Sequence, residues 1–208
     1  MSEYRLGDQS VIFDIVSETS GLSIVEIDDL KSIFNTTEVK NAEVGFGADG
    51  GTNNEVRRSG VIWLDDPFVS KNPKYIEIVQ KISNKIDYIN QQAFKYDLMI
   101  FEPLQLTRYH SSNKEFYDFH IDCTPITQNI CRKLSFVIQL DDPSDFEGGE
   151  FCIINDNGRE YNVSKERPEL IQKGNLIVFP SFLPHKVTPV TSGVRHSLVG
   201  WCSGPRFR

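Results

Sequence analysis

The sequence predicts a mainly β domain of the α+β class, with helices packed outside a core of short strands. In two segments of the first half, apolar residues recur at spacings of three and four, which indicates amphipathic helices. From Asp97 onward, short extended stretches alternate with Gly, Pro and Asp turns, which is typical of a β sandwich or barrel. The 208 residues fit one domain, with helical support and a lid loop in residues 1–96 and the β core in residues 97–208.

The two predicted helices differ in strength. The weaker one runs from about Ser23 to Phe34, with an apolar set of Val25, Ile27, Leu30, Ile33 and Phe34. The stronger one begins at Asn72-Pro73, where Asn can cap free backbone amides and Pro suits the first turn. Its apolar face is predicted to consist of Ile76, Val79, Ile82, Ile86, Ile89 and Ala93. We expect this helix to support a sheet.

Residues 45–60 separate the two helices and read GFGADGGTNNEVRRSG. Their density of Gly and Asn predicts a mobile loop. Two interpretations are open, a surface excursion and a lid over a pocket, because long loops in compact domains often have a function.

The second half contains seven stretches with the character of strands. They are residues 97–109, 115–122, 133–140, 149–154, 175–179, 185–190 and 195–201. Their regular spacing predicts that the chain builds its β core from this half.

The composition excludes several classes of protein. There are 22 Lys and Arg against 29 Asp and Glu, a net charge of -7 without a basic cluster, so nucleic acid is a disfavoured partner. No apolar run has the length that crosses a bilayer, so no membrane partner is expected. The first ten residues lack a secretory signal and the four cysteines lack paired spacing, which leads us to expect a cytoplasmic protein with reduced thiols.

A candidate metal site begins with His120 and Asp122. They lie two apart in the alternating stretch EFYDFHID, so both side chains are expected on one face of a strand. Further along, Thr191-Ser192-Gly193 can close a hairpin between two strands. In that pairing one face would bear His185, Arg195, Ser197, Val199 and Trp201, whereas His196 would point to the other face.

The chemistry of these side chains favours iron. Two imidazoles and one carboxylate leave three coordination positions open, as iron(II) requires when it binds a chelating co-substrate and oxygen. A hydrolytic zinc ion can use the same three ligands. Arg195 decides between the two metals, because a guanidinium on the same face is a natural partner for the carboxylate of a diacid and hydrolysis needs none. The alternative for Arg195 is a surface salt bridge.

An ordered set of short motifs extends from residue 107 to residue 202 and includes these side chains. The set consists of Thr107-Arg108-Tyr109, His120-x-Asp122, Asp142-Pro143, Gly148-Gly149-Glu150, Phe179-Pro180-Ser181, His185 and Pro189-Val190-Thr191-x-Gly193-x-Arg195. It resembles the iron- and 2-oxoglutarate-dependent dioxygenases of the prolyl 4-hydroxylase type, especially bacterial and phage-encoded members. Arg57-Arg58-Ser59 and Trp63-Leu64 extend the resemblance weakly.

The resemblance implies a double-stranded β-helix, the jelly-roll or cupin-like core, with flanking N-terminal helices. It implies Fe(II) held by His120, Asp122 and His185, and 2-oxoglutarate and O2 as co-substrates, with ascorbate as a further candidate. The distal carboxylate of 2-oxoglutarate would meet Arg195 and the hydroxyl of Tyr109, with Trp201 nearby. Gln139 departs from the family, since animal prolyl hydroxylases tend to have a tyrosine there.

By the same resemblance, the expected reaction hydroxylates a prolyl residue of a protein or peptide and releases succinate and CO2. Candidate substrate contacts are Arg57, Arg58 and Tyr117. Two alternatives are open: oxidation of a free small molecule, and a cupin-like protein that binds metal without turnover. Repair of alkylated nucleic acid is disfavoured by the acidic charge balance.

Overall fold

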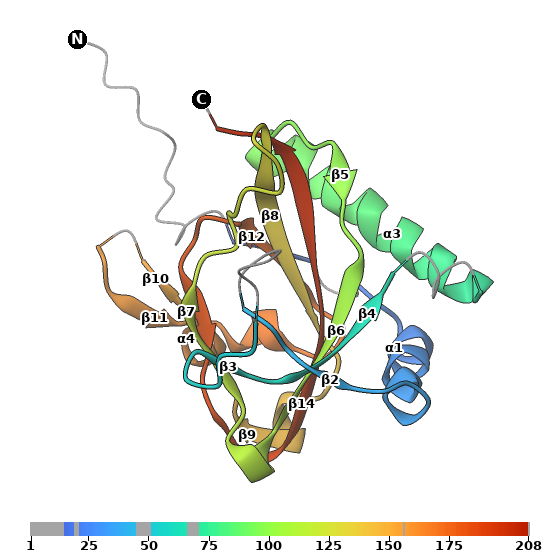
Figure 1. The fold of residues 1–208 in the computed structure, drawn as a ribbon, viewed down its shortest axis with the longest axis vertical. Coiled ribbons are helices and arrows are strands. Elements are labelled where there is room, and N and C mark those ends of the chain that lie inside the picture. The colour runs from blue at the N-terminus through green and yellow to red at the C-terminus, as the bar shows by residue number, and fades with distance from the viewer. Residues whose placement is uncertain (1–14, 19–20, 45–50, 66–70, 156, 208) are drawn as a thin grey trace.

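The computed structural model describes residues 15–18, 21–44, 51–65, 71–155 and 157–207. Two antiparallel sheets face each other and helices flank one of them (Figure 1). This is the double-stranded β-helix that the resemblance implies, so the predicted fold class is confirmed.

The larger sheet follows the order β1-β12-β8-β14-β6-β4-β2, and β5 and β9 also pair with β14. Its strands are β1 (Val16–Glu18), β2 (Lys40–Asn41), β4 (Gly60–Leu64), β5 (Ile100–Phe101), β6 (Leu104–His110), β8 (Ile130–Gln139), β9 (Phe146–Gly148), β12 (Leu176–Pro180) and β14 (Val190–Pro205). The smaller sheet has the order β11-β10-β13-β7-β3, with β3 (Arg57–Arg58), β7 (Phe116–His120), β10 (Phe151–Ile154), β11 (Glu160–Asn162) and β13 (His185–Val187).

The outer face of the larger sheet carries the main hydrophobic core. Strand alternation directs Phe136, Ile138 and Leu198 to this face, where α1 (Ile24–Ser32) and α3 (Pro73–Ile89) cover them (Figure 1). The opposite side chains of the same strands face the smaller sheet. The larger sheet therefore has one apolar face and one face available for polar groups.

The two predicted helices are confirmed, with corrections to their details. Helix α1 begins at the N-cap Ser23, whose side chain forms a capping box with Glu26. On α3 the buried residues are Tyr75, Ile78, Ile82, Ile86 and Ile89.

The predicted apolar face of α3 was wrong at its two ends. Ile76 is 38% exposed and Ala93 is exposed, because a stripe through Tyr75 and Ile78 is the one that faces the sheet. The helix continues as a π turn over Asn90–Phe94, which buries Phe94 in place of Ala93. Asn72 makes no capping hydrogen bond with its side chain, so that prediction was wrong too.

The prediction of a loop over residues 45–60 needs correction at its end. Arg57 and Arg58 form β3 in the smaller sheet, and Gly60 begins β4 in the larger one. The N-terminal half thus adds strands to both sheets besides helices. The lid hypothesis concerned a segment of which residues 45–50 lie outside the described residues.

The predicted hairpin around Thr191-Ser192-Gly193 was also wrong. Strand β13 pairs with β7 and β10 in the smaller sheet, whereas β14 pairs with β6, β8 and β9. Residues 188 and 189 therefore carry the chain from one sheet to the other.

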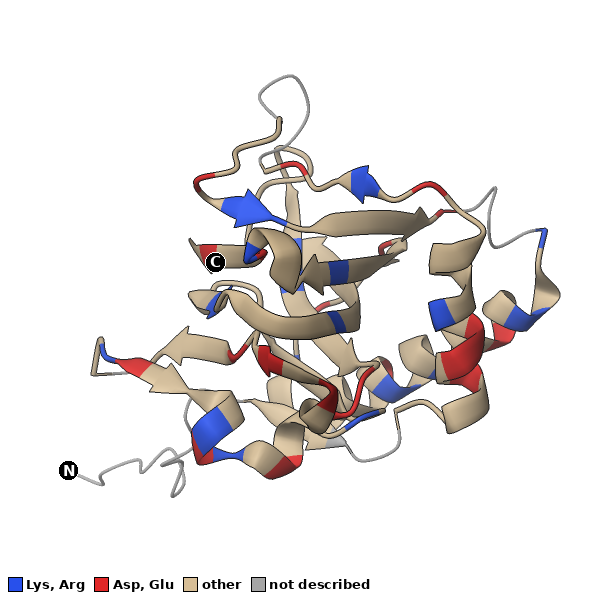
Figure 2. Ribbon diagram, turned by 90° about the horizontal axis from the view of Figure 1, so that it is seen from below, with Lys and Arg blue, Asp and Glu red and all other residues tan. Residues whose placement is uncertain are grey.

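Figure 2 shows Lys and Arg interspersed with Asp and Glu over the elements. No helix in the described part of the chain has the length and apolar character needed to span a bilayer.

Candidate active site

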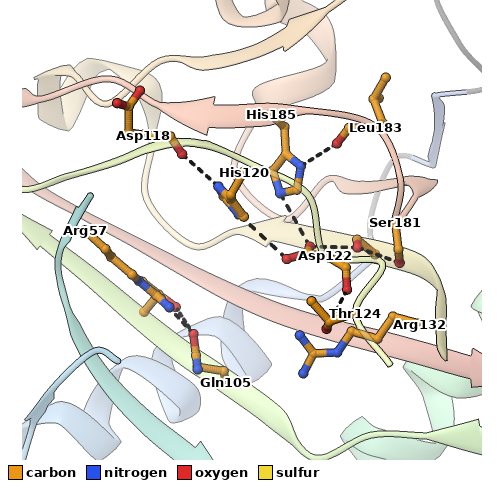
Figure 3. A network of polar contacts seen from close by, with 12 residues as sticks. Arg57, Gln105, Asp118, His120, Asp122, Thr124, Arg132, Ser181, Leu183 and His185 are labelled. Atoms are coloured by element: carbon orange, nitrogen blue, oxygen red, sulfur yellow. Dashed lines mark hydrogen bonds and ion pairs between the residues drawn. The ribbon is translucent and has the colours of Figure 1, made fainter. Parts of the chain in front are cut away.

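Three side chains that could bind a metal converge between the two sheets. His120 ends β7, Asp122 follows two residues later, and His185 begins the neighbouring β13, where it lies directly opposite His120 (Figure 3). One ligand atom from each of the three lies within 4.8 Å of the others. The Nε2 atoms of His120 and His185 are 3.7 Å and 3.4 Å from the carboxylate oxygens of Asp122.

Backbone carbonyls determine how the two imidazoles are oriented. Nδ1 of His120 lies 2.8 Å from the carbonyl oxygen of Asp118, and Nδ1 of His185 lies 2.8 Å from that of Leu183. Because a carbonyl oxygen only accepts hydrogen bonds, each Nδ1 donates. The unprotonated Nε2 of each ring then faces Asp122, as a metal ligand requires.

The electrostatic environment keeps these groups in the protonation states that bind metal. Burial, followed by the nearby His185, lowers the pKa of His120 to about 3, so its ring is neutral at physiological pH. Burial raises the pKa of Asp122, but the neighbouring ring of His185 lowers it more, and the net shift is downward. Asp122 is only 8% exposed and also accepts a hydrogen bond from the hydroxyl of Ser135.

A cavity of about 530 Å³ opens beside this triad and reaches Arg195. Arg195 is 5% exposed, and no carboxylate of the described residues lies within ion-pair distance of it. Its guanidinium lies 5.6 Å from the ring of Tyr109, its partner across the β6–β14 pair. Burial lowers the pKa of Arg195. A buried cation without a counter-ion is costly, so this position favours an anionic ligand.

Comparisons with known proteins agree with this geometry. A family model described as the 2OG-Fe(II) oxygenase superfamily matches residues 104–203. The chain is 31% identical over 119 residues to a PKHD-type hydroxylase of Idiomarina loihiensis, an alignment that covers 56% of this chain and 50% of the relative. The match to the PKHD-type hydroxylase YbiX of Escherichia coli is 31% over 121 residues, covering 56% and 51%. The matched segment, just under half of the chain, contains the three candidate metal ligands and Arg195.

Solved structures of the superfamily share the fold. A prolyl-4-hydroxylase of Pseudomonas putida superposes with a TM-score of 0.66 at 20% identity and covers 94% of both chains. A prolyl hydroxylase of Trichoplax adhaerens, in complex with a peptide fragment of hypoxia inducible factor, superposes with a TM-score of 0.68 at 16% identity, covering 91% of this chain and 83% of that one. The alignments with the two curated relatives span about half the length of each.

The matching superfamily implies Fe(II) and 2-oxoglutarate, and the residues present in this chain fit both. Two imidazoles and one carboxylate form the donor set suited to Fe(II) with open positions. Arg195 supplies the unpaired buried cation that a distal carboxylate needs. His120, Asp122 and His185 are the residues that would hold the metal, and Arg195 beside Tyr109 would hold the co-substrate.

The other predicted site residues fall into two groups. Trp201, Tyr117 and Arg57 line the cavity with the triad. Tyr117 stacks on His120 with 3.5 Å between ring centroids, and Arg57 lies over Tyr117 at 4.5 Å. Burial raises the pKa of Tyr117 to about 12, so its hydroxyl stays protonated. Arg58 does not line the cavity: it is exposed and lies over Phe116, because alternation along β3 turns it away.

Sequence reasoning missed further residues of the candidate site. Arg132 lines the cavity, where its guanidinium makes hydrogen bonds of 2.8 Å to 3.1 Å with Glu102 and lies 3.9 Å from the ring of Trp201. A β-bulge near Ser203 shifts the register of β8, so simple alternation does not predict this position. Ser135 was detectable, because it is a polar residue at an inward position of an apolar strand.

Gln139, the position where the sequence departs from the family pattern, is buried and lies close to Arg195. Its side-chain nitrogen has no hydrogen-bond partner among the described residues. Together with Arg195 it lines a second, smaller cavity of about 200 Å³. The polar group next to Arg195 is therefore a side-chain amide, where animal prolyl hydroxylases tend to have a tyrosine.

Proposed function

We propose that the protein is an Fe(II)- and 2-oxoglutarate-dependent hydroxylase whose substrate is a protein or peptide, with a prolyl residue as the first candidate. The observation that carries this proposal is the pairing of two features in one cavity. A His-Asp-His donor set lies on one side, and the buried, unpaired Arg195 lies on the other. A metal-binding protein without turnover has no need of the second feature.

In the proposed reaction, one atom of O2 enters the substrate and the other enters succinate. Substrate C–H, 2-oxoglutarate and O2 become substrate C–OH, succinate and CO2. Iron(II), when bound, supplies the activation of oxygen. The residues of the chain hold and orient the reactants: Arg195 and Tyr109 would bind the distal carboxylate, so that the oxo-acid end faces the triad.

The walls around the triad exclude water from the reacting centre. Phe151 and Phe179 pack beside the ring of His185, with centroid distances of 6.0 Å and 4.8 Å. Tyr117 covers His120 from another side. An apolar surrounding strengthens the charge interactions inside it and limits side reactions.

The proposal of a peptide substrate rests on the remainder of the cavity. Its volume of about 530 Å³ leaves space beyond a small diacid. Trp201 and Tyr117 border this space and give it a partly aromatic wall, which suits an apolar ring such as pyrrolidine. The peptide bound by the Trichoplax adhaerens neighbour supports this class of substrate.

The first test is an anaerobic titration of the metal-free protein with Fe(II) and then 2-oxoglutarate. We expect a weak visible charge-transfer band when both are present. On admission of O2 we expect succinate, and none from His120→Ala. A folded protein that binds neither ligand would contradict the proposal.

Arg195→Ala should raise the KM for 2-oxoglutarate. The expected factor is roughly 10 to 100, because a charged hydrogen bond contributes about 1.5–3 kcal/mol. Arg58→Ala is the matched control, since this exposed arginine lies outside the cavity and the KM should not change. If the two variants have the same KM, Arg195 does not bind the co-substrate.

The substrate class is tested by incubating the loaded protein with a library of proline-containing peptides. Mass spectrometry should detect peptides heavier by one oxygen atom, and fragmentation should place that atom on proline. Turnover of free amino acids with no turnover of peptides would identify the substrate as a small molecule instead.

A further inference from the structure

Two buried serines connect the carboxylate of Asp122 to the larger sheet. Ser135 lies on β8 and donates its hydroxyl proton to Oδ2 of Asp122 over 2.8 Å. The hydroxyl oxygen of Ser181, directly after β12, lies 2.9 Å from that of Ser135 (Figure 3). The two serines are only 1% and 0% exposed, so no water competes for these hydrogen bonds.

The direction of the hydrogen bonds follows from the number of protons. Each serine has one hydroxyl proton, and the ionised Asp122 can only accept. Since Ser135 gives its proton to Asp122, the hydrogen bond between the serines must be donated by Ser181. The result is a chain from Ser181 through Ser135 to Asp122, in which each bond polarises the next.

Ser181 also holds the backbone on which Asp122 lies. Its carbonyl oxygen accepts hydrogen bonds of 2.8 Å from the amides of both Asp122 and Cys123. Its own amide donates to the carbonyl of Lys133 on β8 over 2.9 Å. Ser181 precedes His185 by only four residues, so one short segment positions two of the three candidate ligands.

We propose that Ser135, supported by Ser181, is a positioning residue that reserves Oδ2 of Asp122 for hydrogen bonding. The carboxylate would then bind the metal through Oδ1 alone. This inference rests on the proposed iron site. A carboxylate that binds through both oxygens would take a fourth coordination position, and too few would remain for a chelating oxo acid together with O2.

Variants of the two serines test this role through metal binding, independently of turnover. Ser135→Ala should weaken Fe(II) binding roughly 10- to 100-fold, the range typical for lost partners of metal ligands. It should also shift or weaken the charge-transfer band of the 2-oxoglutarate complex. Ser135→Thr keeps the hydroxyl and should retain both properties. Ser181→Ala should have a smaller effect, because Ser135 can still donate to Asp122.

Two controls separate positioning from a general loss of packing. Ser203 is also 0% exposed and donates to a carboxylate, that of Glu102, over 2.6 Å, but it does not contact the triad. Ser203→Ala should therefore keep the Fe(II) affinity of the wild type. Ser135→Cys fills nearly the same space with a weak donor and should resemble Ser135→Ala; circular dichroism verifies that each variant is folded.

The outcomes distinguish this inference from the proposed function. If the wild-type protein binds Fe(II) and shows the band while Ser135→Ala and Ser135→Cys match it, the positioning role is wrong and the hydroxylase proposal stands. If the folded wild-type protein binds no Fe(II), both proposals are wrong. Equal losses in Ser135→Ala and Ser203→Ala would also overturn the inference, because burial would then explain the effect.

Discussion

At the scale of single residues, His120 illustrates how the protein prepares a metal ligand. The carbonyl of Asp118 holds the proton on Nδ1, and burial beside His185 lowers the pKa of the ring to about 3. The ring is therefore neutral without metal, and binding an ion requires no loss of a proton from His120 at neutral pH.

This low pKa predicts that the metal-free protein becomes less stable in mild acid. His120 has an ordinary pKa near 6.5 when unfolded, so below that value the unfolded state binds a proton that the folded state does not. The contribution of the neutral His120 ring to the free energy of unfolding is complete above pH 6.5 and is lost as the pH falls toward 3. The loss can reach about 1.4 kcal/mol per pH unit.

Denaturant unfolding of metal-free protein between pH 7 and pH 4 measures this loss. His120→Gln should show a shallower decline in the free energy of unfolding, because glutamine does not titrate. Identical slopes for the variant and the wild type would show that His120 is not responsible.

Residue-level reasoning from the sequence succeeded where strand alternation is regular. It predicts that Arg195, Ser197, Val199 and Trp201 share a face, and these four line the cavity. His185 was assigned to the same face through the predicted hairpin, which was wrong: His185 lines the cavity from the smaller sheet. It failed for Arg132, since a bulge within β8, between Leu134 and Arg132, changes the phase of the alternation. A bulge depends on the partner strand, which the local sequence does not reveal.

At the scale of elements, β14 joins the site to the rest of the fold. It pairs with β6, β8 and β9, and its alternation sends Arg195 into the cavity and His196 toward α1. The sequence predicted this alternation correctly but paired it with the wrong strand. A hairpin and a crossover between sheets have the same pattern of side chains, so the pattern alone does not separate them.

Asp141 links α1 to β14 through hydrogen bonds to both, next to Arg195. The buried carboxylate accepts hydrogen bonds from Lys31 of α1 and from the backbone amide of His196, and a third of 3.0 Å from the His196 ring. Burial raises the pKa of Asp141, but these donors lower it more. Asp141 thereby fixes the residue next to Arg195.

We expect Asp141→Ala to lower the free energy of unfolding by about 2–4 kcal/mol, because buried donors would lose a charged acceptor. The KM for 2-oxoglutarate should rise as well, since the part of β14 that contains Arg195 would no longer be held in place. Lys31→Met is the control: the Lys31 side chain is 33% exposed, so its loss should cost about 1 kcal/mol or less. A stable Asp141→Ala protein with an unchanged KM would refute this coupling.

At the scale of the whole molecule, the order of helices before strands predicted helices packed outside a β core, and the family resemblance implied the jelly roll. The predicted division of the domain at residue 96, into a helical part and a β core, was less informative, because β3 and β4 from the first part enter the two sheets. Arg57 reaches the cavity from β3, so the N-terminal half also supplies a wall of the site. Short strands such as β3, with two residues, have too few positions for a periodic signal.

Metal binding should stabilise the whole fold, since the candidate ligands come from two strands and a loop. A metal ion present at a concentration of 100 times its Kd would raise the free energy of unfolding by about 2.7 kcal/mol. For a chain of this size, this corresponds to a rise in Tm of roughly 5–10 °C. Differential scanning calorimetry with and without Mn(II), a redox-stable substitute, measures the shift. His185→Ala should show almost none; a rise in Tm as large as that of the wild type would place the ion elsewhere.

The crossover between β13 and β14 places His185 and Arg195 on opposite sheets. In the proposed complex, a diacid would therefore span the gap between the layers, which is about 10 Å in packed sheets. Discrimination between diacids of different length would then depend on the thickness of the sandwich and not on any single side chain. The wall formed by Arg57, Arg132 and Trp201 could change during evolution to accept new substrates while the co-substrate stayed the same.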